Sequence, residues 1–285
     1  MKKLILIVKS NLRRSKTQTV SIFVLVLLSS MLLNIWLILS FDYKENFWRC
    51  HDRLNAEHVT MVLDNSQDEF CHYLEETVKQ QQNTSEYSID KTFWMSGNIS
   101  YNGGTLSSDF FVLEKDMACT RLIGNYEITQ DSELKSGIYL PMLFGIGTNY
   151  SVGDVIEISC ANRVLSYTVC GFYNSAMTGS HNCGMCAFLV TEDIWEELER
   201  EEFIPSSTLL SVRLYDKSQS EFYEAAIKNA VSRQFPSIQA LSNSWVVVSQ
   251  SRYISQMICS GIVSAMACLV IIISLVVIAS GITND

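Results

Sequence analysis

The chain contains few of the residue types and none of the short motifs on which most catalytic chemistry depends. It has 4 histidines and 3 prolines among 285 residues. The sequence lacks a G-x-x-x-x-G-K-[ST] phosphate loop, a G-x-S-x-G elbow and an H-E-x-x-H helix. These absences exclude ATP hydrolysis on a P-loop, esterase-type hydrolysis and zincin chemistry. We therefore predict that the chain has no catalytic residue, no directly bound cofactor and no metal site.

Acidic residues are absent from the N-terminal region and outnumber basic residues in the region that follows. Residues 1–41 contain no acidic residue, and residues 42–252 contain 15 basic against 29 acidic residues, a balance of −14. An acidic region of this size argues against nucleic acid as a partner and permits cationic peptides as ligands. The basic residues at the N-terminus are Lys2, Lys3, Lys9, Arg13, Arg14 and Lys16.

Two long apolar runs are the dominant positive feature. Val20–Phe41 and Met257–Ile278 each contain 22 residues and no charge. At about 1.5 Å per helical residue, each run reaches about 33 Å, which matches the hydrocarbon core of a bilayer. We predict transmembrane helices over residues 19–41 and 253–280. Asn34 is polar within the first run and favours a neighbouring helix over lipid.

The basic N-terminus sets the expected topology. By the positive-inside rule, the N-terminus is cytoplasmic, residues 42–252 are extracytoplasmic, and the second span returns the chain to the cytoplasm. The first span has no A-x-A-like site after it, so we expect an uncleaved anchor in a multi-pass cell-membrane protein. Residues 1–18 read as a basic amphipathic helix in the headgroup layer, or alternatively as a tail that serves only as a topogenic signal.

Aromatic residues flank both runs on the predicted outer side. Tyr43, Phe47 and Trp48 follow the first run, and Trp245 and Tyr253 precede the second. We expect them to act as interfacial anchors. In the second run, the small residues Gly261, Ser264, Ala265 and Ala267 predict a helix-packing face, against either the first span or a second protomer.

The region between the runs alternates strand and helix patterns. Strands are expected near residues 58–63, 87–101, 106–114, 155–159, 164–173, 185–190 and 208–215. Capping boxes at Ser66-x-x-Glu69 and Ser218-x-x-Glu221 predict two helices. We predict an α+β ectodomain of strand–helix–strand units with a β-rich insertion. Its proximal lobe would comprise residues 42–100 and 185–250, and its distal lobe residues 101–184.

Several stretches resemble the permease subunits of ABC transporters of the MacB/FtsX type. The basic segment Lys9–Lys16 leading into an apolar helix is similar to that family's N-terminal elbow. Gly137–Pro141 (GIYLP), Ser151–Ile158 (SVGDVIEI) and Tyr167–Tyr173 (YTVCGFY) follow one another as in its extracytoplasmic core domain. The Gly-Asp of the second stretch also fits a tight turn before a strand. The order of these stretches carries the resemblance, which covers nearly the whole chain.

The resemblance implies a transporter subunit that is not itself an ATPase. A cytoplasmic ABC ATPase binds ATP and drives a pair of permease protomers, as a homo- or heterodimer. Their long helices transmit the motion to an extracytoplasmic domain that handles a peptide, lipoprotein or drug. Antimicrobial peptide export or resistance, and a bacterial source, are among the implied properties.

The chain departs from the family pattern at its C-terminal end. Members have four transmembrane helices, whereas this sequence ends a few residues after its second run, at Asp285. We expect residues 281–285 to be the cytoplasmic end of a truncated chain or of a split permease.

Cys183 and Cys186 form a C-x-x-C in the predicted ectodomain, with His181 nearby. A disulfide or redox-labile pair, a metal site and ordinary unpaired thiols all remain open for this motif. The ectodomain holds 7 cysteines, an odd number, so at least one is unpaired within the chain.

Three functions are consistent with the sequence. The first is a permease subunit, or its N-terminal part, coupled to a partner ATPase. The second is a two-span receptor or interaction protein that binds a ligand without transport. The third, a thiol oxidoreductase using Cys183 and Cys186, fits least, because the motif lacks the strand-to-helix setting such pairs use.

Overall fold

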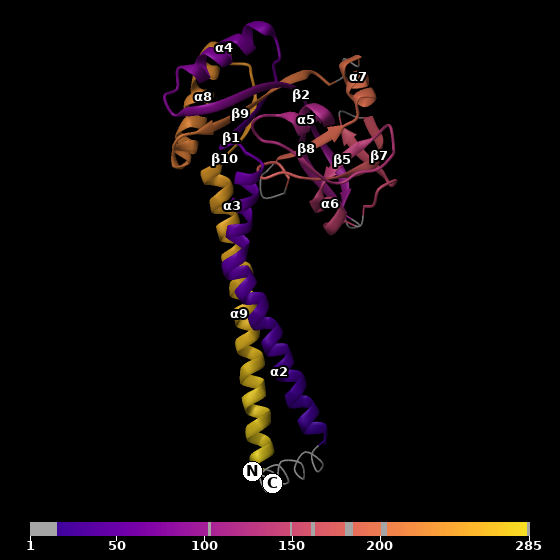
Figure 1. Cartoon of the computed structure of the whole chain (residues 1–285), viewed down its shortest axis with the longest axis vertical. Helices are drawn as coiled ribbons and strands as arrows, with labels where there is room; N and C mark the ends of the chain where they lie inside the picture. Colours follow the sequence, from indigo (N-terminus) through magenta and orange to yellow (C-terminus); the bar gives the residue numbers. More distant parts are fainter. Residues whose placement is uncertain are drawn as a thin grey trace. The chain divides into compact units, whose positions relative to one another are not determined.

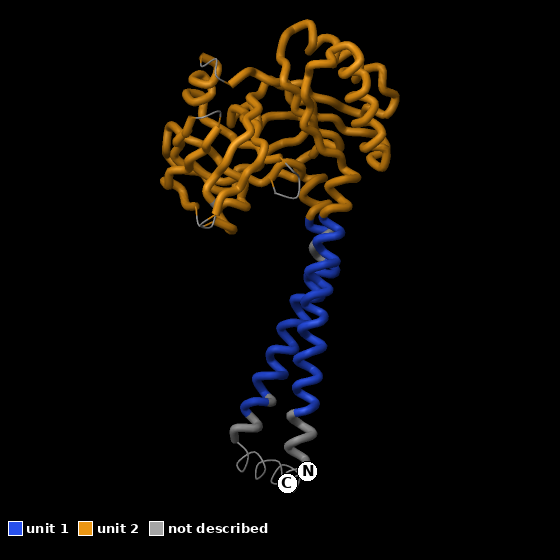
Figure 2. The backbone as a smooth tube through the Cα atoms, turned by 180° about the vertical axis from the view of Figure 1, so that it is seen from behind, with its two compact units in different colours: residues 1–46, 252–285 blue, residues 47–251 orange. Residues whose placement is uncertain are grey.

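The computed structural model of the chain describes residues 16–101, 104–148, 150–160, 163–179, 185–200 and 204–283. The chain divides into two compact units, of which unit 1 comprises residues 1–46 and 252–285 and unit 2 comprises residues 47–251 (Figure 2). Most of the predicted basic helix of residues 1–18 lies outside the described residues. The same holds for His181, Cys183 and the basic residues Lys2, Lys3, Lys9, Arg13 and Arg14.

Unit 1 is made of helices. Helix α2 (Lys16–Leu37) leads into a five-residue π-helical segment, η1 (Ile38–Asp42), and then into α3 (Tyr43–Arg53). Helix α9 (Trp245–Thr283) ends the described chain and contributes residues to both units. The stretches Phe23–Phe41 and Trp245–Val276 are long and apolar enough to cross a membrane, and neither is enclosed by protein. The two predicted apolar helices are thus confirmed.

Unit 2 is built on one sheet of ten strands (Figure 1). Its strand order is β10-β1-β9-β2-β3-β8-β5-β7-β4, and β6 bridges β2 and β7. The strands are β1 (Val59–Leu63), β2 (Thr84–Tyr101), β3 (Gly104–Glu114), β4 (Glu127–Gln130), β5 (Ile138–Pro141), β6 (Val155–Cys160), β7 (Arg163–Asn174), β8 (Met185–Val190), β9 (Ser206–Leu214) and β10 (Ala240–Ser244).

The bridging by β6 closes six of these strands into a barrel. Going round, β2 pairs with β3, β3 with β8, β8 with β5, β5 with β7, β7 with β6, and β6 again with β2. A closed ring leaves no exposed edge among its members. Its interior is filled by the inward side chains of all six strands, among them Ile99, Phe110, Leu140, Ile158 and Phe188.

Three of the other four strands form an open sheet together with part of β2, covered by two helices, and the fourth, β4, pairs with β7. Strands β10, β1, β9 and the first half of β2 lie side by side, with α4 (Asp68–Lys79) and α8 (Ser220–Gln234) on one face (Figure 1). Both helices turn an apolar stripe inward, with Phe70, Leu74 and Val78 in α4. Because β2 belongs to both parts, the open sheet and the barrel share a backbone. The predicted α+β fold class is confirmed, whereas the lobe bounds 42–100, 101–184 and 185–250 stay a prediction.

The remaining described helices contact the barrel, except for a short 3-10 segment that contacts β9 and α8. They are α5 (Lys115–Thr120), α6 (Met142–Gly147), α7 (Glu192–Arg200) and the short 3-10 segment η3 (Lys217–Gln219). Helix α7 begins after Thr191 and buries Ile194 and Leu198 against the barrel core.

The two predicted capping boxes are wrong, although the helices they announce exist. The residue before α4 is Gln67, whose side chain makes no capping bond, and the Ser66 hydroxyl bonds Ser206 instead. Before α8, Asp216 caps the 3-10 segment through the backbone of Ser218. In the first case the Ser66 hydroxyl bonds a residue outside the four-residue pattern, and in the second the capping carboxylate belongs to Asp216, which is also outside it.

The stretches that carried the family resemblance form one part of the barrel. Gly137–Pro141 leads into β5, Ser151–Ile158 contains the turn into β6, and Tyr167–Tyr173 lies in β7. Gly153 has a φ of +93°, which L-residues rarely adopt, so the predicted Gly-Asp turn is confirmed. Gly171 is required for a different reason, since a Cβ there would overlap the carbonyl oxygen of Gln130 and lie 2.8 Å from the Tyr139 ring.

Replacing Gly171 by alanine is expected to destabilise unit 2 by about 3 kcal/mol. The new methyl group has backbone on one side and a buried ring on the other, and overpacked sites of this kind relax poorly. Ser166→Ala, at an exposed position of the same strand, is the matched control and is expected to change little. Urea unfolding monitored by tryptophan fluorescence measures both, and equal stabilities would contradict the close approach at Gly171.

Candidate functional site

The helices of unit 1 expose an apolar surface and keep one half-buried face each. In α2, half-buried positions recur every three or four residues, at Leu25, Ser29, Leu32, Trp36 and Leu39. Helix α9 shows the same spacing, at Gln256, Ser260, Val263, Ala267, Val270 and Ser274. This spacing is that of two helices packed along a seam. We therefore assign these faces to each other.

The predicted small-residue face of the second span divides between two sides of α9. Ser264 and Ala267 belong to the half-buried side, whereas Gly261 and Ala265 are exposed. A Cβ at Gly261 would meet no atom within 4 Å. Within the described residues, the seam with α2 thus uses only half of the predicted face.

Polar groups in the first helix are satisfied by their own backbone. The Ser29 hydroxyl donates to the carbonyl of Leu25 at 2.8 Å, and the Asn34 amide donates to the carbonyl of Ser30 at 2.8 Å. Such bonds lower the cost of polar side chains in lipid. Asn34 remains exposed, and its preference for a neighbouring helix stays a prediction.

A cluster of aromatic side chains lies in unit 2 and includes residues of α3 and of the start of α9. The rings of His51 and His58 stack with centroids 5.2 Å apart, and Trp245 meets the His51 ring edge-on at 4.5 Å. Phe47 stacks on Trp245 at 5.4 Å, and the ammonium group of Lys217 lies 4.4 Å from the Trp245 ring centroid. These contacts join three separate segments of the chain.

Two of the predicted interfacial anchors are buried in this cluster. Phe47 is 8% and Trp245 6% exposed, so their rings stabilise unit 2 instead of contacting lipid. Trp48 at 41% and Tyr253 at 53% are exposed and keep the predicted anchor role. The sequence pattern alone could not separate the two pairs, because burial depends on the histidine stack.

Both histidines of the cluster are held neutral. Nε2 of His51 donates to the carbonyl of Glu57 at 3.1 Å, and Nδ1 of His58 accepts from the backbone N–H of Leu214 at 2.9 Å. Burial lowers the pKa of His51, and it lowers the pKa of His58 to about 3, with the nearby positive charges of Arg213 and Lys217 adding to the effect. Neither ring is placed to exchange protons near neutral pH, so the cluster fits a structural role better than catalysis.

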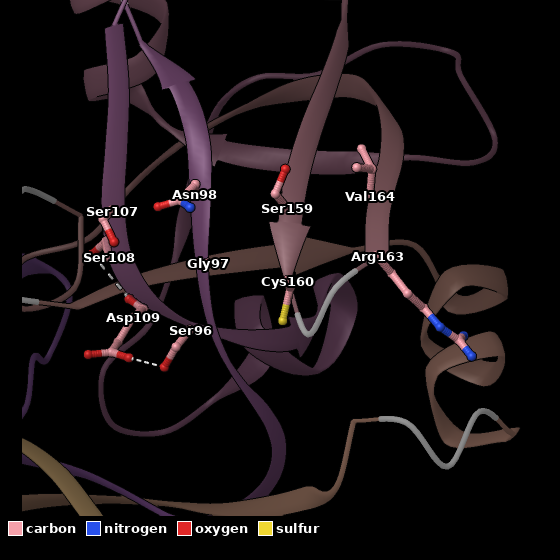
Figure 3. A pocket seen from close by; sticks show the side chains of 10 residues that line it. All are labelled: Ser96, Gly97, Asn98, Ser107, Ser108, Asp109, Ser159, Cys160, Arg163 and Val164. Atoms are coloured by element: carbon pink, nitrogen blue, oxygen red, sulfur yellow. Dashed lines mark hydrogen bonds between the residues drawn. The ribbon is translucent and has the colours of Figure 1, made fainter.

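A polar groove of about 660 Å³ lies on the outside of the barrel (Figure 3). Ser107, Asn98, Ser159 and Val164 form a row across β3, β2, β6 and β7, as the strand registers require. At one end, Asp109 accepts hydrogen bonds from Ser96 and from the indole N–H of Trp94. Short hydroxyl and amide groups can bind a polar ligand through hydrogen bonds. None of the described residues that line the groove is a histidine.

The structure places the C-x-x-C motif only in part. Cys186 lies in β8, is 2% exposed and packs in the barrel core, whereas Cys183 is outside the described residues. A disulfide or redox pair between them therefore stays a prediction. Among the described residues, no group of three histidine, cysteine or acidic side chains is placed to hold a metal ion.

Comparisons with known proteins give only distant likenesses. No family model and no curated protein matches the chain. Among solved structures, the periplasmic region of MacB from Actinobacillus actinomycetemcomitans is 9% identical and covers 68% of this chain and 92% of its own, with a TM-score of 0.31. The extracellular domain of the ABC-type transporter YknZ from Gram-positive bacteria is also 9% identical, covering 64% and 99%, with a TM-score of 0.30.

A third likeness is to a domain assigned to a permease protein of Porphyromonas gingivalis. It is 11% identical and covers 66% of this chain and 89% of its own, with a TM-score of 0.29. TM-scores this far below 0.5 establish neither a shared fold nor a shared activity.

Proposed function

We propose that the chain is a permease subunit, or the N-terminal part of one, of an ABC transporter of the MacB/FtsX type. A separate cytoplasmic ATPase supplies the energy, and α2 and α9 pass its motion to the extracytoplasmic unit 2. One observation carries the proposal: a compact α+β unit is inserted between two apolar helices, and its barrel contains the family-like stretches in their family order.

The ectodomain is proposed to handle a peptide, lipoprotein or drug outside the membrane. Its charge balance of −14 favours cationic ligands, and the serine-lined groove offers uncharged hydrogen-bonding groups. Chemistry on the ligand is not required of this chain, because in this class of transporter the bound nucleotide and its hydrolysis belong to the partner subunit.

The experiment is purification of the full chain from the membranes of its own host, followed by an ATPase assay. We expect an ABC ATPase to co-purify at a fixed ratio and to hydrolyse ATP in a vanadate-sensitive manner. The Gly171→Ala variant is the control, because a weakened ectodomain leaves the cytoplasmic contacts in place, so the ATPase should still co-purify.

Purification of the chain with no nucleotide-hydrolysing partner would contradict the transporter proposal. A ligand-binding receptor with two spans would then be the better explanation. Protease accessibility in intact cells tests the orientation independently. Cleavage within residues 47–251 from outside the cell agrees with an extracytoplasmic unit 2, and cleavage only in inverted vesicles contradicts it.

A further inference from the structure

The helix that leaves the first span changes its hydrogen-bonding pattern before it becomes α3. Between Ile38 and Asp42 the chain is π-helical, and regular α-helix resumes at Tyr43. A π-turn bonds each N–H to the carbonyl five residues back, so it accommodates one more residue than an α-turn. Carbonyl groups next to the extra residue lose their ordinary partners, and such turns occur frequently at functional positions.

A single side chain of α9 donates hydrogen bonds to two carbonyls of this segment. The amide nitrogen of Gln256 donates to the carbonyl of Leu39 at 2.8 Å and to that of Ser40 at 2.9 Å. A primary amide carries two hydrogens, so both bonds form at once. All three residues are half-buried and belong to unit 1.

The surroundings make these bonds hard to replace. Leu39 and Ser40 lie at the end of the apolar stretch Phe23–Phe41, where water is scarce and unpaired carbonyls are costly. The hydroxyl of Ser260, one turn further along α9, donates to the carbonyl of its own helix at Met257. Gln256 is therefore the residue of the α9 seam that reaches across to the π segment.

We propose that Gln256 is the positioning residue that fixes the register of α2 against α9. The π segment η1 and the Gln256 amide together form the joint, which is the point along the helix pair where this register changes. The register is sensitive to the extra residue, because removing one residue from a helix turns everything on one side of it by about 100° and shifts it by about 1.5 Å. While the amide is bound, the extra residue stays between Ile38 and Asp42. The proposal concerns the helix pair alone and does not depend on a partner ATPase.

The test is hydrogen–deuterium exchange of the full chain in lipid nanodiscs, read over residues 38–46. We expect Gln256→Leu to lower the protection factors of this segment at least tenfold, since both carbonyls lose their donor. Gln250→Leu is the matched control, because it makes the same change at an exposed position of the same helix, and it should leave the segment unchanged. Protection of unit 2 in the same spectra verifies that each variant is folded.

A second variant distinguishes a hydrogen-bond donor from mere packing. In Gln256→Glu, an ionised carboxylate repels the two carbonyls, and a protonated one donates a single bond. In Gln256→Glu, protection over residues 38–46 is expected to be as low at neutral pH as it is in Gln256→Leu. On acidification it should recover in part, with Gln250→Leu measured at each pH as the reference. Absence of any recovery would assign Gln256 a packing role and overturn the proposal.

Deletion of Ser40 tests the joint itself. Without the extra residue, α2 and α3 can form one α-helix whose carbonyls are satisfied internally, so Gln256→Leu should have no further effect in that background. Equal losses of protection with and without the deletion would show that Gln256 acts independently of the π segment. Wild-type protection in Gln256→Leu alone would equally overturn the proposal.

Discussion

Lowering the pH from 7 to 5 is expected to destabilise unit 2 by about 2 kcal/mol through His58 alone. The pKa of His58 is about 3 in the folded chain, against an ordinary value of 6.5, so between these two values the unfolded chain binds a proton that the folded chain does not. Stability therefore rises with pH across this window and is lost as the pH falls below 6.5. His51, whose pKa is also lowered by burial, adds to the loss.

The charges around the pair determine how the loss develops. Asp52 lies 3.5 Å from Nδ1 of His51 and the Glu57 carboxylate is nearby, and both favour protonation of that ring. Arg213 and Lys217 oppose protonation of His58. We therefore expect His51 to protonate in the folded chain before His58 does, with unfolding following as the second ring is charged.

The measurement is urea unfolding of the full chain at pH 7, 6 and 5, for three proteins. His58→Asn keeps an acceptor for the Leu214 N–H but cannot titrate, so its stability should fall less with acidification than that of the wild type. His72→Asn, at an exposed position of α4, is the control and should retain the wild-type slope. Parallel pH profiles for wild type and His58→Asn would refute the assignment.

Replacing Arg121 by alanine is expected to cost about 3–5 kcal/mol of unfolding free energy. Its guanidinium group is 3% exposed and contacts the Asp90 carboxylate at 2.8 Å, the Ser211 hydroxyl at 2.8 Å and the carbonyl of Gly124 at 3.3 Å. Removing it leaves the 17%-exposed Asp90 carboxylate without its cation and two buried acceptors without a donor. The loop after α5 would then lose its attachment to β2 and β9.

Two comparisons separate this effect from a general loss of charge. Arg53→Ala breaks an exposed bidentate pair with Glu127, at 3.0 and 2.7 Å, and should cost less than about 1 kcal/mol. The double variant Arg121→Leu with Asp90→Leu removes both buried charges together and is expected to be more stable than Arg121→Ala. If Arg121→Ala and Arg53→Ala unfold at the same urea concentration, the buried network contributes little.

The sequence predicted those parts of the fold that depend on local pattern. Three features could be predicted because each depends on neighbouring residues in the sequence. They are the alternating residues of β6 and β7, the apolar runs of α2 and α9, and the turn at Gly153. Closure of the barrel could not be predicted from the sequence. It depends on β6 meeting β2 about 60 residues away, where the missing side chain of Gly97 allows the Ser159 carbonyl to approach.

The candidate sites were harder to predict for the same reason. His51 and His58 are close to each other in sequence, but their burial depends on Trp245, almost 190 residues away. Gln256 stands one residue before the second apolar run and reads as an ordinary boundary residue. The sequence of Ile38–Asp42 has no pattern that predicts a π-turn, so the hydrogen-bond partner of the Gln256 amide could not be predicted.

The pairing of the first and last strands determines how unit 2 responds to force. In the antiparallel pair β1–β10, Val59 lies opposite Ser244, and just beyond it the Trp245 N–H donates to the carbonyl of His58 at 2.7 Å. The chain thus enters and leaves the pair at the same end. A pull that separates residues 58 and 245 opens the ladder one rung at a time, like a zip, whereas a pull on opposite ends would load every rung together. Unit 2 is therefore expected to resist separation of its two chain ends less than it resists shearing of β1 along β10.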